Sequence, residues 1–193
     1  MSSEEDANLL TNPDRHYRFT FAEYEAMINA GIRGECHKVE LIDGYVLEME
    51  PYTRELDLVA NRAMRHFLDL DPEQYAGMVK ATLYVGEGFV PDPDYWLAKM
   101  DDFTLRVDPD DILLIIEVAE ESLRFDLEVK ARLYARAGVA ELWVVDLPQL
   151  LLHRFTRPAP GGYLDHTVLT EDELVTPLKV PSKPLYLRDL LGR

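Results

Sequence analysis

The residue whose type and position most suggest chemistry is Glu117. It directly follows residues 112–116, an aliphatic run that is apolar on both faces, as a central buried strand is. An ionised carboxylate in such a strand is costly unless it is paired or coordinates a metal. The alternative is that Glu117 lies where the strand ends and the sheet opens to solvent. Strand ends of that kind are also where α/β sheets bind their ligands.

A second carboxylate, Asp94, belongs to the segment Pro91-Asp92-Pro93-Asp94, which leads into a β-prone stretch. Pro-Asp pairs are ordinary turn residues, so this segment alone is a weak indication of function. On two adjacent strands, Asp94 and Glu117 would form a carboxylate pair of the kind that holds Mg²⁺ together with waters and a substrate phosphate. Such a pair is the minimum for metal-assisted hydrolysis of a phosphodiester.

Lys130 lies on the helix that we expect directly after Glu117, over about residues 123–136. On the inward face of that helix, its ammonium could reach the carboxylates and stabilise charge that develops on phosphate oxygens. Asp126 precedes Lys130 by four residues, and this spacing alone is explained more simply by a surface ion pair.

The elements that must position these residues follow from hydrophobic patterns and turn signals. Strands over 112–118 and 141–146 flank the helix, which predicts a crossover unit with parallel strands. The remaining expected elements are a capped helix from Thr20 to about Gly31, a hairpin of 39–42 and 45–49, a helix over 53–69, a strand over 78–85, and a hairpin of 150–155 and 163–169. We therefore expect one mixed α/β domain over 17–193, with a hairpin at each end and a loosely ordered tail over 1–16.

The composition restricts the class of protein. The 193 residues include 20 Lys and Arg and 36 Asp and Glu, so the net charge is −16. Such a body repels phosphate backbones, which argues against a general nucleic-acid-binding protein but leaves open a local groove or a cluster of acids around a cation. The single Cys36 excludes a disulfide framework within the chain. No basic start or long apolar run indicates export or a membrane partner, so we expect a cytoplasmic protein.

The stretch from Ile115 to Asp146, which begins IIEVAEESLRFDLEVK, resembles the core of the Uma family of restriction-endonuclease-like proteins. That family is a branch of the PD-(D/E)xK nuclease superfamily. Residues 39–44 and the Pro93-Asp94 pair resemble its other two signatures, in the same order. The resemblance implies a four-stranded mixed core sheet flanked by helices, a Mg²⁺ or Mn²⁺ cofactor, and DNA as the substrate.

Carried over to this sequence, the resemblance makes Asp94 the motif aspartate, Glu117 the second acid and Lys130 the lysine. The lysine would have moved from the strand to the following helix, because Ala119 stands where the superfamily has it. Glu40 and the carbonyl of Val118 would be further metal ligands. The alternative role of Glu40 is that of an exposed strand residue opposite Val46 or Leu47.

Two positions depart from the family pattern. Glu55 stands where members often have histidine, and Asp92 where they often have glutamine. Two functions therefore remain open: a DNA endonuclease, or a catalytically inactive structural or interaction module that keeps the nuclease fold. A homodimer is plausible for the endonuclease, since cutting both strands of a duplex usually takes two sites.

Overall fold

The computed structural model describes residues 16–32, 38–49, 53–99 and 106–193. The tail expected over 1–16 lies outside these residues except for His16, and so does Cys36. No helix within the described ranges is long and apolar enough to cross a membrane.

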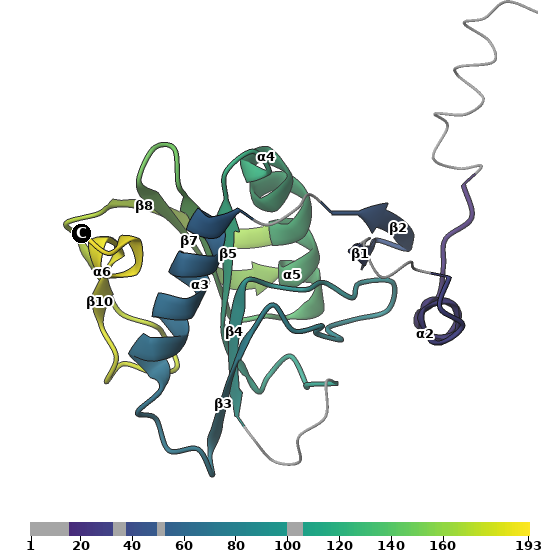
Figure 1. Ribbon diagram of the computed structural model, residues 1–193, viewed down its shortest axis with the longest axis horizontal. Helices are drawn as coiled ribbons and strands as arrows, with labels where there is room; N and C mark the ends of the chain where they lie inside the picture. Colours follow the sequence, from purple (N-terminus) through teal and green to yellow (C-terminus); the bar gives the residue numbers. More distant parts are fainter. Residues whose placement is uncertain (1–15, 33–37, 50–52, 100–105) are drawn as a thin grey trace, which may run out of the picture.

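A mixed sheet of six strands forms the centre of the molecule (Figure 1). Its order is β3-β4-β5-β6-β7-β8; β5 and β6 are parallel, and the other neighbouring strands are antiparallel. The expected crossover unit is therefore confirmed. The sheet is wider than the four strands that the family resemblance implies, because the C-terminal hairpin pairs with β6. The strands are β3 (Tyr75–Val79), β4 (Tyr95–Lys99), β5 (Ile112–Ala119), β6 (Glu141–Asp146), β7 (Leu151–Ala159) and β8 (Gly162–Thr170).

Helices cover both faces of this sheet (Figure 1). On one face, α3 (Arg54–Phe67) and α6 (Leu187–Leu191) bury Val59, Leu187 and other apolar side chains against Ile116 and Trp143. On the other face lies a helix in three parts: α4 (Leu123–Phe125), the π-helical turn η2 (Asp126–Lys130) and α5 (Ala131–Ala137). Each face buries its own apolar cluster, and this burial is the main force that holds the layers together.

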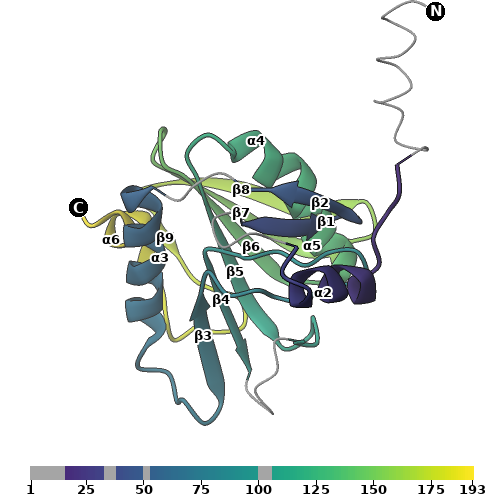
Figure 2. The ribbon, with the colours of Figure 1, turned by 45° about the vertical axis from the view of Figure 1, so that its right-hand side comes forward.

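The N-terminal part packs beside the second face (Figure 2). It consists of α2 (Phe21–Asn29) and the expected hairpin of β1 (Val39–Ile42) and β2 (Tyr45–Glu48). The hairpin turn places Asp43 at φ 50° and Gly44 at φ 81°, as a two-residue turn with left-handed backbone requires. Backbone bonds between Leu41 and Val90 in both directions attach β1 to the rest of the domain. This attachment positions Glu40.

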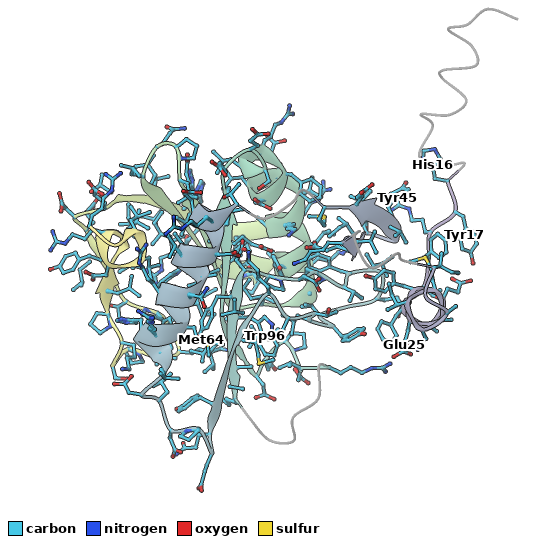
Figure 3. The ribbon with its side chains drawn as sticks, viewed as in Figure 1. His16, Tyr17, Glu25, Tyr45, Met64 and Trp96 are labelled. Carbon is cyan, nitrogen blue, oxygen red and sulfur yellow. The ribbon has the colours of Figure 1, made fainter. Side chains whose placement is uncertain are left out.

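Side chains show the same division between interior and surface (Figure 3). Trp96 of β4 lies in the interior, where its indole nitrogen donates to the Ala81 carbonyl at 2.9 Å. Met64 lies on α3 and is partly exposed. The C-terminal segment, with β9 (Leu174–Val175) and β10 (Leu185–Tyr186), packs on the body of the same chain through Leu185, Leu187 and Leu190.

Two expected elements differ from the structure. The bounds of the strand expected over 78–85 are wrong. The observed strand β3 spans Tyr75–Val79, and it ends there because Lys80 adopts a left-handed backbone with φ 49°. The helix expected over 123–136 is present but is interrupted by the π-turn η2. A π-turn adds one residue to a helical turn and therefore changes the direction of every side chain that follows it relative to the preceding part.

Candidate metal and catalytic site

The register of the sheet brings Asp94 and Glu117 to one place. Tyr95 of β4 lies opposite Ile116 of β5 in an antiparallel pair, so the residue before Tyr95 and the residue after Ile116 meet at the same end of the two strands. Asp94 Oδ2 accepts a hydrogen bond of 2.8 Å from the backbone N–H of Val118. Both carboxylates are buried, with Asp94 6% and Glu117 3% exposed.

Lys130, the last residue of η2, reaches the same place from the helix layer. Its Nζ lies 3.2 Å from Glu117 Oε1. It also lies 3.2 Å from Glu40 Oε2 and donates to Glu40 Oε1 at 3.5 Å. One buried ammonium thus contacts two carboxylates from different parts of the chain. Glu40 lies opposite Leu47 in the hairpin, as one of its two predicted roles requires. That role predicted an exposed side chain, however, and Glu40 is buried.

Asp126, at the other end of η2, is buried as well. A surface ion pair between Asp126 and Lys130 is therefore the wrong interpretation of their spacing. The Asp126 carboxylate accepts a hydrogen bond of 2.7 Å from the Ser122 hydroxyl. Ser122 precedes α4, but its hydroxyl binds this side chain and makes no capping bond to the backbone.

Two further residues belong to the site, although the sequence gives them no role. Tyr134 of α5 donates its hydroxyl to Glu117 Oε1 at 2.7 Å. Its spacing of four residues from Lys130, on the same helical stripe, is a signal that could have identified it. The other is Lys80, whose Nζ lies 3.8 Å from Asp94 Oδ1 and also forms an ion pair with Asp57. No local pattern in the sequence indicates Lys80, because the loop after β3 brings it there.

Burial dominates the acid–base properties of the site. It raises the pKa of Glu117 to about 8, although Lys130 acts to lower it. It raises the pKa of Asp94 to about 6 against the hydrogen bond from Val118 and the charges of Lys80 and Lys130. Burial alone would lower the pKa of Lys130, but the surrounding carboxylates outweigh it and hold this pKa well above its usual value. The lysine is therefore charged, and it faces more carboxyl groups than it can pair with.

A pocket of about 90 Å³ opens between these side chains. Five acidic residues and one lysine are among the residues that line it: Glu40, Asp92, Asp94, Glu117, Asp126 and Lys130; Met49, Leu56, Val118 and Ser122 line it as well. Two buried carboxylate oxygens, Asp94 Oδ1 and Glu40 Oε2, accept no hydrogen bond within the described part of the chain, although Lys80 Nζ lies 3.8 Å from the first and Lys130 Nζ 3.2 Å from the second. Several carboxylate oxygens gathered in one pocket suit a small hard cation such as Mg²⁺ or Mn²⁺.

Within the described residues, no three acidic, His or Cys side chains are arranged to chelate an ion by themselves. A cation here would therefore take one or two carboxylates, and water molecules would fill the remaining positions, as is usual for Mg²⁺. Asp94, with its unbonded Oδ1, and Glu117 fit this requirement. The ligand roles of Asp94, Glu117, Glu40 and the Val118 carbonyl, and the catalytic role of Lys130, all stay predictions.

The two residues that depart from the family pattern lie in different places, and two arginines of the helices lie away from the site. Glu55 lines a separate pocket at the start of α3, whereas Asp92 lines the pocket of the site. Arg62 donates to the carbonyls of Leu190 and Leu191, which end α6. Arg136 pairs with Asp43 of the hairpin turn. Neither arginine lines the pocket of the site.

Comparisons with known proteins agree with the fold. The family model Uma2, described as "Putative restriction endonuclease", matches residues 21–183. No curated protein matches the chain in sequence. A crystal structure described as "a putative nuclease belonging to DUF820 from Anabaena variabilis" matches with a TM-score of 0.71 at 14% identity. The match covers 90% of this chain and 98% of that chain, so the two share a fold over nearly their whole length.

Proposed function

Because this chain belongs to the Uma2 family of restriction-endonuclease-like proteins, we propose that it is a DNA endonuclease of the PD-(D/E)xK type that depends on Mg²⁺ or Mn²⁺. The observation that carries the proposal is the convergence of Asp94, Glu117, Glu40 and Lys130 on one pocket at the end of β4 and β5. The three acids come from three separate segments and Lys130 from a fourth, and such a buried cluster of ionisable groups is typical of functional sites.

We assign each of these four residues its own role in phosphodiester cleavage. Asp94 and Glu117 would hold the cation, which when bound would polarise the phosphate and lower the pKa of a water molecule. Glu40 would orient Lys130 or add a further oxygen donor. Lys130 would keep its proton and stabilise negative charge on the phosphate oxygens, an electrostatic contribution that grows in a water-poor pocket.

The direct test is cleavage of supercoiled plasmid in the presence of Mn²⁺. We expect Asp94→Asn and Lys130→Met each to reduce the cleavage rate by at least about 100-fold, the size of effect seen when one group that stabilises a transition state is removed. Lys99→Met is the matched control, since Lys99 lies at the opposite end of β4 and pairs with Asp111 at the surface. If Asp94→Asn and Lys130→Met both cut as fast as the wild type, this site is not the active site.

The inactive-module alternative makes a different prediction. It predicts no heat of Mn²⁺ binding in calorimetry and no rise in melting temperature when Mn²⁺ is added. The endonuclease proposal predicts both effects in the wild type. Burial has raised the pKa of both Asp94 and Glu117, so their ionised forms are poorly solvated and a cation would stabilise them.

A further inference from the structure

Glu117 receives two hydrogen bonds on the same oxygen. Lys130 Nζ donates to Oε1 at 3.2 Å, and the Tyr134 hydroxyl donates to it at 2.7 Å. Both donors come from one continuous helical segment, four residues apart, so they approach Glu117 from the same side. With Oε1 held on the helix side, Oε2 is the oxygen left for a ligand in the pocket that Glu117 lines.

Lys130 and Tyr134 differ in how well they can fix the rotation of the Glu117 carboxylate. Lysine carries its charge on a flexible stem and can donate to either oxygen of a carboxylate. Lys130 is in addition shared with Glu40. The Tyr134 hydroxyl, in contrast, sits at the end of a rigid ring that is fully buried and packed edge-on against Phe89, with ring centroids 4.9 Å apart. Tyr134 is therefore the donor that can fix the rotation of the Glu117 carboxylate.

We propose that Tyr134 is a positioning residue that holds Glu117 with Oε1 toward the helix and Oε2 toward the cation. The proposal rests on the endonuclease function above and adds a residue to it. Tyr134 is not among the residues that line the pocket, so we assign it no direct contact with the cation. Its effect should therefore be on the affinity for the cation, because outer hydrogen-bond partners of metal ligands act in this way.

The test is calorimetric titration of the full chain with Mn²⁺ alone, without DNA. We expect Tyr134→Phe to bind Mn²⁺ about 10- to 100-fold more weakly than the wild type. The matched control is Tyr163→Phe, because Tyr163 also has a largely buried hydroxyl, which donates at 2.8 Å to the Val139 carbonyl away from the site. Both variants lose one hydroxyl and one hydrogen bond, so both should lose some thermal stability. Only Tyr134→Phe should lose Mn²⁺ affinity.

Plasmid cleavage gives a second readout that a purely structural role would not change. For Tyr134→Phe, the half-saturating Mn²⁺ concentration should rise by about the same factor as the dissociation constant, while the maximal rate at saturating Mn²⁺ stays within a few-fold of the wild type. Wild-type Mn²⁺ affinity in Tyr134→Phe would overturn the positioning role and leave the endonuclease proposal intact. Equal weakening in Tyr163→Phe would also overturn it. Absence of Mn²⁺ binding by the wild type would overturn both proposals.

Discussion

At the residue scale, burial of an acid does not by itself indicate function. Glu141 is fully buried in the same sheet as Glu117, but its oxygens accept hydrogen bonds from Arg154 at 2.7 Å, Trp143 at 2.8 Å and the Leu178 backbone at 2.6 Å. It lies on the opposite face of the sheet and ties the C-terminal segment to it. The acids around Lys130 differ from Glu141 because Asp94 Oδ1 and Glu40 Oε2 accept no hydrogen bond and have only the ammonium groups of Lys80 and Lys130 nearby.

This difference predicts opposite effects of substitution. We expect Glu141→Ala to lower the free energy of unfolding by about 3–5 kcal/mol, because it removes one partner of a buried ion pair and several hydrogen-bonded contacts. Asp94→Asn should change stability far less and abolish cleavage. Chemical denaturation of both variants measures the two effects. A Glu141→Ala protein as stable as the wild type would show that Glu141 has no structural role.

Single residues also show what the sequence could and could not reveal. Glu117 was recognisable because a charge follows five aliphatic residues, and Asp94 because the Pro-Asp segment and the family signature coincide. Lys80 could not be recognised, since its position depends on its own left-handed backbone conformation just after β3, which no local pattern indicates. The role of Tyr134 was hidden because an aromatic residue on the inward stripe of a helix is normally part of the core.

At the element scale, local patterns predicted most of the architecture. The Asp43-Gly44 turn, the parallel pair β5–β6 and the C-terminal hairpin are all present as expected. The π-turn η2 was not predictable, because the apolar spacing of residues 123–136 fits an ordinary helix. The turn begins at Asp126 and ends at Lys130, and both of these side chains are buried in the site. Such turns are frequent at functional sites.

The β7–β8 hairpin brings together two histidines that are 13 residues apart in the sequence. His153 Nδ1 lies 3.0 Å from His166 Nε2, and the rings are stacked. Burial lowers the pKa of each imidazole, and the charge of His166 lowers that of His153 further, against a raising effect of Asp146. Near pH 6.5 the folded protein therefore binds fewer protons at this pair than the unfolded chain does.

It follows that this pair destabilises the fold as the pH falls below about 6.5, the unfolded pKa of histidine. Above that pH the penalty is absent. We expect the free energy of unfolding to fall less between pH 7.5 and pH 5 in His166→Gln than in the wild type. Identical pH profiles for His166→Gln and the wild type would contradict this role of the pair.

At the scale of the whole molecule, a net charge of −16 must be reconciled with the proposed DNA substrate. The negative body repels DNA at long range, so we expect productive contact to depend on the proposed cation. We expect no measurable binding to duplex DNA in EDTA at about 150 mM salt, and binding that appears with Ca²⁺ or Mn²⁺. Fluorescence anisotropy with a labelled duplex measures this. Tight binding in EDTA would instead indicate a nucleic-acid-binding protein that needs no cation.

The central claim is that Asp94 and Glu117, brought together by the register of β4 and β5 and faced by Lys130, form one cation site. A crystal of the protein soaked in Mn²⁺, with anomalous scattering recorded, tests it most directly. The account predicts one strong anomalous peak in the pocket, within coordination distance of Asp94 Oδ1 and Glu117 Oε2, and its loss in Asp94→Asn. An empty pocket at saturating Mn²⁺, or manganese bound only elsewhere on the acidic surface, would contradict it.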